Sequence, residues 1–356
     1  MKLTVIVPVF NISEYLPRFF DAMAKQTFRD YTLLIIDDGS EDDSLAVCRS
    51  FAERDSRIKV VASEHVGVTA VKTKGLELVD TPFTAYADGD DYVEPDYLKH
   101  LMDAREKYDA DLAISRVQYH VEDGRIEGAF PARGEMLIKR EEFADKIPML
   151  LDDRRLNYLY GKVYRSSLLK GIHIPDDVRQ GSDTMTNFKF LENASSIVLI
   201  DDLDYHYTRY NSRSVTSYAG EDAFLRINRI NRVVYDESEK MGILNEKMLS
   251  VIDSRVLQSA VWVIDKIIAS ENTDDEKARQ ISAILRDAFY LACYERQKQR
   301  NTALKFEVIA PQDGAEYLKK RQKIKANLNK KARILQSTPD FVVRLYHKIK
   351  GNSPEE

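Results

Sequence analysis

The apolar positions of the first 115 residues follow two periodicities. Runs of consecutive apolar and β-branched residues predict buried strands, and between them apolar residues recur at helical spacing, as in Leu16, Phe19, Phe20 and Met23. The predicted strands are residues 3–9, 31–37, 58–62, 83–87 and 111–115. Because the stretches between them are long enough for crossover helices, the pattern predicts an α/β fold with a mostly parallel, buried sheet.

The pattern changes after residue 116. Glu122-Asp123-Gly124 predicts a hairpin turn, and residues 221–300 have helical periodicity almost throughout. The predicted domains are an α/β domain over 1–218, a helical domain over 219–312 and a basic amphipathic helical tail over 313–356. The apolar stripes over 221–300 must pack on the α/β domain, on each other or on a second copy of the chain, so a homo-oligomer through these helices is one expectation.

Composition places the chain among ordinary globular proteins. Of its 356 residues 44% are hydrophobic and 31% charged, which excludes a disordered or collagen-like chain. No apolar run reaches the roughly 18 residues that a membrane span needs, and the first strand is too short for a signal peptide. The two cysteines, Cys48 and Cys293, form neither a metal-spacing motif nor a disulfide framework. We therefore expect a cytoplasmic protein.

The net charge of -5 is unevenly distributed. Residues 319–350 carry eleven lysines and arginines against one acid, Asp340, whereas the preceding part of the chain is acidic. Residues 341–350 place cations opposite Phe341, Leu345 and Ile349. This pattern favours peripheral binding to the anionic inner face of the cell membrane or to a polyanionic polymer. A solvated basic helix is the alternative. Nucleic acid is a poorer partner, because the body is acidic and the tail lacks interleaved aromatic residues.

Two acidic clusters follow predicted strands. Asp37-Asp38-Gly39-Ser40 comes after the second strand and Asp88-Gly89-Asp90-Asp91 after the fourth. Ligands of open parallel sheets bind at the carboxyl ends of the strands, where both clusters are expected to lie. Capping of the following helices would also explain such aspartates. Adjacent carboxylates repel unless a cation is present, and Mg²⁺ or Mn²⁺ is held by few carboxylates together with substrate phosphates. The clusters therefore predict a metal–phosphate site and a nucleotide-containing substrate.

These motifs together resemble those of family 2 glycosyltransferases. The matching segments are Pro8-Val9-Phe10-Asn11, Gln26-Thr27-Phe28, Ile35-Ile36-Asp37-Asp38-Gly39-Ser40 and Asp88-Gly89-Asp90-Asp91, within a resemblance that covers about residues 1–217. The resemblance implies a Rossmann-like GT-A fold with a C-terminal helical extension. It also implies inverting, metal-dependent transfer of a hexosyl or N-acetylhexosaminyl group from a UDP-sugar, with Mn²⁺ or Mg²⁺ as cofactor.

The resemblance assigns the donor side of the site. Its nucleoside residues are Pro8, Phe10, Asn11 and Asp38, with Asp38 accepting from the uracil ring, and further donor contacts come from Gly67, Lys72, Asp88, Gly89, Arg209 and Ser214. Lys72 stands where the family has an arginine, and it lacks the bidentate fork of arginine. Asp90 is the expected metal ligand, and Asp88 faces the ribose or the donor sugar. Arg209 and Ser214 belong to a loop that closes over the donor phosphates.

The acceptor side rests on Gly181-Ser182-Asp183. The resemblance makes Asp183 the general base that deprotonates the attacking hydroxyl, whereas a purely structural interpretation makes it the N-cap of the next helix. Ser182 replaces a glutamate that helps to seat the acceptor in the family. Tyr160 and Lys162, from a Tyr-Gly-Lys-Val-Tyr-Arg segment, are further acceptor-side candidates.

The sequence thus predicts transfer of a sugar to a hydroxyl of a cell-surface glycan, such as a capsule, exopolysaccharide or teichoic-acid-like polymer, free or lipid-linked. A nucleotidyltransferase would need a glycine-rich phosphate loop after the first strand, and Pro8-Val9-Phe10-Asn11 is not one. A non-catalytic scaffold with a degenerate nucleotide or membrane site is the other alternative. A dinucleotide oxidoreductase is disfavoured because no Gly-x-Gly-x-x-Gly motif follows the first strand.

Overall fold

The structure is a computed structural model that describes residues 1–121, 124–175, 178, 181–209, 223–300, 310, 313–321 and 323. The chain divides into two compact units. The first comprises Met1–Tyr218 and Leu225–Arg255, and the second comprises Ala219–Phe224 and Val256–Glu356. Most of the predicted basic tail, from residue 324 on, lies outside the described residues.

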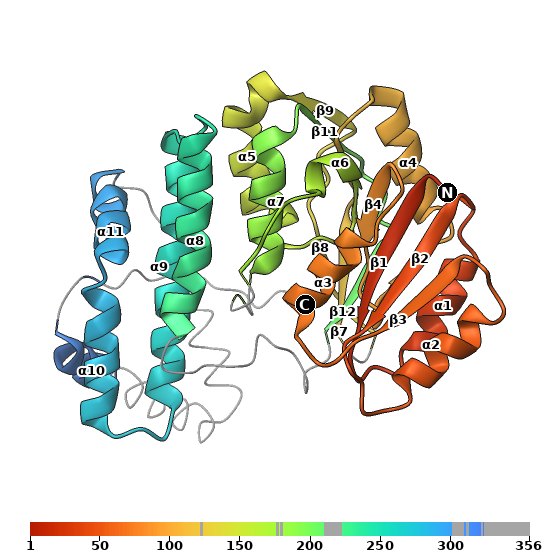
Figure 1. Ribbon diagram of the computed structural model, residues 1–356. Helices are drawn as coiled ribbons and strands as arrows, with labels where there is room; N and C mark the ends of the chain where they lie inside the picture. Colours follow the sequence, from red (N-terminus) through yellow and green to blue (C-terminus); the bar gives the residue numbers. More distant parts are fainter. Residues whose placement is uncertain are drawn as a thin grey trace, which may run out of the picture. The chain divides into compact units, whose positions relative to one another are not determined.

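The first unit is built on an eight-stranded sheet (Figure 1) in the order β3-β2-β1-β4-β10-β6-β11-β9. Its strands are β1 (Leu3–Val9), β2 (Tyr31–Asp37), β3 (Ile58–Ala62), β4 (Phe83–Tyr86), β6 (Leu112–Ile114), β9 (Met136–Lys139), β10 (Lys162–Arg165) and β11 (Ser196–Leu199). β1, β2, β3 and β4 run parallel, as do β6 and β11, whereas β10 is inserted antiparallel between β4 and β6. The predicted α/β fold with a mostly parallel sheet is confirmed.

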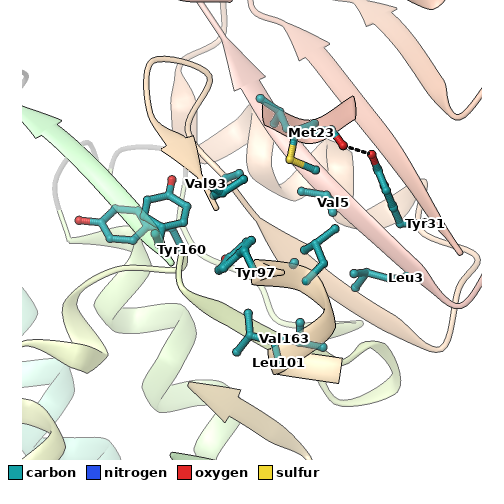
Figure 2. Packing of buried hydrophobic residues seen from close by; sticks show 14 of the residues in the cluster. Leu3, Val5, Met23, Tyr31, Val93, Tyr97, Leu101, Tyr160 and Val163 are labelled. Atoms are coloured by element: carbon teal, nitrogen blue, oxygen red, sulfur yellow. Dashed lines mark hydrogen bonds between the residues drawn. The ribbon is translucent and has the colours of Figure 1, made fainter. Parts of the chain in front are cut away.

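Helices cover both faces of this sheet. The main core joins alternate β1 residues, such as Leu3 and Val5, to α1 (Leu16–Ala24) and α4 (Tyr97–Tyr108), and Cys48 of α2 (Ser44–Ala52) packs in the same core. Figure 2 shows this core, including the bond of 2.6 Å that Tyr31 Oη donates to the Met23 carbonyl. α3 (Val68–Glu77) packs against the opposite side of β1, where Ile6 lies.

A second, four-stranded sheet has the order β5-β12-β7-β8. Its strands are β5 (Tyr92–Val93), β7 (Val117–Val121), β8 (Ile126–Ala129) and β12 (Tyr205–Arg209). β7 and β8 pair antiparallel, as the predicted hairpin requires. Tyr205 of β12 stacks on Tyr160 with ring centroids 4.8 Å apart, and this contact joins the small sheet to the main core.

The remaining helices of the first unit lie between and after the strands. They are η1 (Arg140–Glu142), α5 (Phe143–Asp152), η2 (Arg155–Asn157), α6 (Ser166–Leu169) and α7 (Ser182–Asn193). α8 (Ala223–Lys240) packs on α7 through Ile230 and Met185.

The second unit is helical in its described part, with α10 (Asp274–Leu285) and α11 (Ala288–Arg300). α9 (Glu246–Ala269) contributes residues to both units. This region is the C-terminal helical extension that the fold prediction contains. Within the described ranges, no helix combines the length and the hydropathy that crossing a membrane requires. The predicted domain bounds at 218 and 312 and the expected localisation stay predictions.

Candidate active site

The acidic turn after β4 lies at the carboxyl edge of the sheet. A Cβ atom on Gly89 would come within 2.8 Å of Ile12 Cδ1 and 3.2 Å of Leu16 Cδ2, so a side chain there would displace the ends of these two side chains. Asp91 is buried, and both of its carboxylate oxygens are used: Oδ2 accepts from Tyr205 Oη at 2.7 Å and Oδ1 from the Thr208 N–H at 3.0 Å. Asp91 therefore ties the turn to β12, which leaves Asp88 and Asp90 as the carboxylates able to serve a ligand.

The carboxylates of this turn carry an unfavourable excess of negative charge. Burial raises the pKa of Asp88 to about 7; Lys72 opposes this shift, and Asp90 and Asp183 add to it. Burial also raises the pKa of Asp90. A divalent cation between these oxygens would offset both burial and repulsion, so the residues fit a hard metal ion.

Asp183 lies in the first turn of α7 and is held from two sides. Its Oδ1 is 2.8 Å from Lys72 Nζ, and its Oδ2 accepts from the Leu159 N–H at 3.3 Å. The N-cap of α7 is Gly181, with φ +76° and no room for a Cβ beside Ile230. Asp183 is thus not the N-cap of α7, and that alternative assignment is wrong.

Lys72 connects the two acidic groups. It lies on α3, and its side chain is only 14% exposed. Burial alone would lower the pKa of Lys72, but attraction from Asp183 and Asp88 outweighs burial and raises it. A charged lysine therefore contacts the expected base and also lies close enough to Asp88 to be attracted by it.

The nucleoside side is formed by the ends of β1 and β2 and by the loop before α3. Asp38 is buried and accepts from the backbone N–H groups of Val66 at 2.8 Å and Gly67 at 3.0 Å. His65 Nδ1 lies 3.0 Å from Asp38 Oδ2, and the His65 ring stacks on Phe10 with centroids 4.3 Å apart. His65 precedes the predicted donor residue Gly67 but was itself not expected to take part in the site, and its place beside Asp38 comes from the structure.

The other predicted donor residues fall at the same edge. Pro8 pairs with Ile36 in the parallel β1–β2 ladder. Asn11 has φ +52°, and its Oδ1 accepts from the Glu41 N–H at 2.8 Å, so it fixes the loop after β2. Arg209 is the last residue of β12, with a side chain outside the described part, and Ser214 lies wholly outside the described residues.

The predicted acceptor-side residues are more enclosed than expected. Ser182 is buried, with Oγ 3.5 Å from Asp183 Oδ1. Tyr160 is 3% exposed and stacks on Tyr158 and Tyr205, whereas Lys162 is 0% exposed. Tyr160 and Lys162 lie behind the base, and their contact with an acceptor stays a prediction.

One further group in the described part of the chain has cation-binding side chains within 4.8 Å of one another: His100, Asp202 and Asp204. His100 Nδ1 is 2.7 Å from Asp204 Oδ2 and 3.3 Å from Asp202 Oδ1. Burial works against protonation of His100, but the two aspartates outweigh it and raise the pKa of the imidazole. The contacts of the imidazole with the two aspartates account for this group without a bound ion.

Comparison with known proteins identifies the class. Residues 4–159 match the family model "Glycosyl transferase family 2". Residues 4–159 therefore belong to a family 2 glycosyltransferase domain with the GT-A fold, and the resemblance inferred from the motifs is confirmed.

Three relatives show how far the similarity extends. Glycosyltransferase GlyA of Streptococcus pneumoniae is 35% identical over 113 residues, which cover 32% of this chain and 16% of GlyA. EpsH of Bacillus subtilis is 24% identical over 295 residues, 81% of this chain and 84% of EpsH. Poly(ribitol-phosphate) beta-N-acetylglucosaminyltransferase TarS of Staphylococcus aureus is 23% identical over 260 residues, 69% of this chain and 43% of TarS.

The solved structures agree on the fold. The crystal structure of S. aureus TarS 1-349 in complex with UDP-GlcNAc matches with a TM-score of 0.59 at 20% identity, covering 87% of this chain and 95% of that chain. The similarity therefore extends past the family 2 domain into the helical region.

Proposed function

We propose that this glycosyltransferase moves a sugar from a UDP-sugar to a hydroxyl of a cell-surface glycan or polyol-phosphate acceptor, with inversion. The observation that supports this most directly is the Asp183–Lys72–Asp88 arrangement, which places a held carboxylate beside an acidic, phosphate-compatible turn. Membership of family 2 and the intact acidic residues argue against the nucleotidyltransferase and scaffold alternatives.

The donor side of the proposal rests on the edge formed by β1, β2 and the turn after β4. The Asp38 carboxylate accepts hydrogen bonds from the backbone N–H groups of Val66 and Gly67. The Phe10 side chain is 41% exposed, so its ring is available to a ligand at this edge. Asp88 and Asp90 are the residues that would hold Mn²⁺ or Mg²⁺. Such an ion, when bound, neutralises charge on the diphosphate leaving group. TarS, whose structure includes UDP-GlcNAc, supports UDP as the nucleotide.

The chemical step needs one base on the acceptor side. The acceptor O–H proton passes to the Asp183 carboxylate, the acceptor oxygen forms the bond to the anomeric carbon, and the bond from that carbon to the phosphate oxygen breaks, so that UDP leaves with the electron pair. Lys72, 2.8 Å from Asp183 Oδ1, holds this carboxylate in place before the acceptor binds. A single displacement of this kind inverts the anomeric centre.

The acceptor class is inferred from relatives and from tail charge. TarS is named for transfer to poly(ribitol-phosphate), an anionic polymer. The eleven cations of residues 319–350 fit a surface of that charge, whether polymer or membrane leaflet. We therefore propose an anionic cell-surface polymer or its lipid-linked precursor as the acceptor.

UDP release from a panel of UDP-sugars tests the reaction. With Mn²⁺ and a polyol-phosphate or glycan acceptor, one donor is expected to release UDP at least tenfold faster than the others, and the sugar should appear on the acceptor in the opposite anomeric configuration. Mass spectrometry and NMR of the product check both points. Release of pyrophosphate in place of UDP would contradict the proposal.

Removal of residues 319–356 tests the role of the basic tail. The truncated protein is expected to lose at least tenfold in affinity for vesicles that contain anionic lipid or for poly(ribitol-phosphate), because each basic residue near a lipid surface contributes on the order of 1 kcal/mol. Hydrolysis of the donor should change less than twofold. Co-sedimentation measures the first quantity, and equal association by both proteins would refute this role.

A further inference from the structure

Two fully buried side chains, those of Lys162 and Asn187, form hydrogen bonds to the turn that joins η2 to β10. Lys162 Nζ donates to the Tyr158 carbonyl at 2.7 Å and to the Tyr160 carbonyl at 3.3 Å. Asn187 Nδ2 also donates to the Tyr158 carbonyl, at 2.9 Å. Both Lys162 and Asn187 are 0% exposed. The Tyr158 carbonyl is thus held by donors from a strand and from a helix at the same time.

Asn187 connects this turn to the helix of the base. It lies one helical turn after Asp183 on α7, so both side chains leave the same face of the helix. Asn187 Nδ2 donates to the Leu156 carbonyl at 3.0 Å, and Asn187 Oδ1 accepts from Tyr164 Oη at 2.8 Å. The Leu159 N–H, between the held carbonyls, meets Asp183 Oδ2. The turn and α7 are therefore joined at Asn187 and again at Asp183.

We propose that Lys162 and Asn187 are positioning residues for the base: by fixing the carbonyls of residues 158 and 160 they aim the Leu159 N–H at Asp183 and set its orientation toward the acceptor. The proposal rests on the proposed function in that Asp183 is the base. In this proposal Lys162 acts through the turn in place of the predicted contact with the acceptor, because its side chain is 0% exposed.

The hydrogen-bond partners of Lys162 are unusual for a buried lysine. A buried ammonium is unfavourable unless it is paired, and here its bonding partners are two neutral carbonyls in place of a carboxylate. Burial lowers the pKa of Lys162 to about 7, against the attraction of Asp183 and with the repulsion of Arg155, which face it from α7 and η2. Loss of the Lys162 proton near neutral pH removes a positive charge from the turn that contacts Asp183.

Substitution of Lys162 by methionine, which fills similar volume without a donor, tests the positioning role. Lys162→Met is expected to lower kcat 10- to 100-fold, to leave the KM for the UDP-sugar within twofold, and to abolish an inflection near pH 7 in the profile of kcat against pH. Lys162→Gln keeps a donor without the charge, so it should recover most of kcat while still lacking the inflection. Unchanged kcat in both variants would overturn the proposal.

Arg105→Met is the matched control. Arg105 is also a buried cation that donates to a backbone carbonyl, that of Ala110 at 3.1 Å, and its carboxylate partner is Asp109. Its loss should lower the melting temperature but leave kcat and the pH profile as in the wild type. If Arg105→Met changes kcat and the pH profile as Lys162→Met does, the effect of Lys162→Met is general destabilisation and the proposal is overturned.

Two further measurements keep the outcome decisive. If Lys162→Met does not fold, Tyr164→Phe, which removes one bond to Asn187, should still lower kcat severalfold at unchanged KM; no change would contradict the proposal. Transfer by the wild type and its loss in Asp183→Asn are measured in the same assay. If the wild type transfers no sugar, the proposed function itself fails; if it transfers and both Lys162 variants equal it, only the positioning role fails.

Stability against pH checks the charge of Lys162 independently of activity. Between pH about 7 and 10.5 the unfolded lysine holds a proton that the folded one has lost, so the free energy of unfolding should rise with pH across this window. Lys162→Met should lack this rise. If the stability difference between the two proteins is constant over the window, the lysine does not lose its proton there and the pH component is refuted.

Discussion

Asp183→Asn is expected to lower kcat by about a thousandfold while leaving the affinity for UDP and Mn²⁺ within twofold of the wild type. A positioned general base contributes roughly 10²- to 10⁴-fold, and an amide of the same shape cannot take the acceptor proton. The amide can still accept from the Leu159 N–H, but it no longer forms an ion pair with Lys72. Initial rates of sugar transfer and calorimetric titration with Mn²⁺·UDP measure the two quantities.

Lys189→Gln, on the exposed part of the same helix, is the control for Asp183→Asn. Lys189 lies 3.8 Å from Glu237 in a partly exposed pair, which contributes little to stability. This variant should retain wild-type transfer. If Asp183→Asn retains more than a tenth of the wild-type kcat, another residue supplies the base and the assignment is wrong.

Asp90→Asn is expected to reduce transfer by at least a hundredfold at saturating donor and to raise the Mn²⁺ concentration needed for half-maximal rate. Removal of one of two partly buried carboxylates takes away a metal ligand but also relieves repulsion. Without metal, the melting temperature should therefore stay constant or rise. EDTA should abolish transfer by the wild type, and titration of Mn²⁺ against UDP release measures the shift.

Asp91→Asn separates the metal role from the structural role of this turn. The two carboxylate oxygens of Asp91 accept hydrogen bonds from Tyr205 Oη and from the Thr208 N–H. An amide in this place has one oxygen and can accept from only one of these donors. The variant should melt earlier but keep the wild-type dependence on Mn²⁺. The assignment is wrong if Asp90→Asn needs the same Mn²⁺ concentration as the wild type. It is also wrong if Asp91→Asn loses its dependence on Mn²⁺, because Asp91 would then be the metal ligand.

The first three strands could be predicted from the sequence to the residue, whereas the predictions 83–87 and 111–115 are longer than the observed β4 and β6. Residues 3–9, 31–37 and 58–62 coincide with β1, β2 and β3. β1 and β2 are covered on both faces, so their composition is almost wholly apolar and unlike that of the surrounding helices. β10 was harder to foresee, because Lys162 and Arg165 make its four residues look polar, although Lys162 is completely buried.

Candidate site residues could be proposed from the sequence motifs, but the contacts of these residues could not. Motif order alone indicated Asp88, Asp90 and Asp183 as the acids of the site. That Lys72 meets Asp183, 111 residues away, depends on α3 and α7 approaching across the sheet edge, for which the sequence carries no periodic signal. The pairing of Asp91 with β12 likewise depends on the small sheet, whose strands are short and irregular.

The antiparallel insertion of β10 has a consequence for the synthesis of this protein. β4 and β6 are both neighbours of β10 and not of each other, so neither can complete its hydrogen bonding before residue 165 has been made. A nascent chain that stops short of β10 exposes two open strand edges, the feature that promotes intermolecular strand pairing. The half-made chain is therefore the most aggregation-prone state of this enzyme, and slow translation between residues 115 and 165 would prolong it.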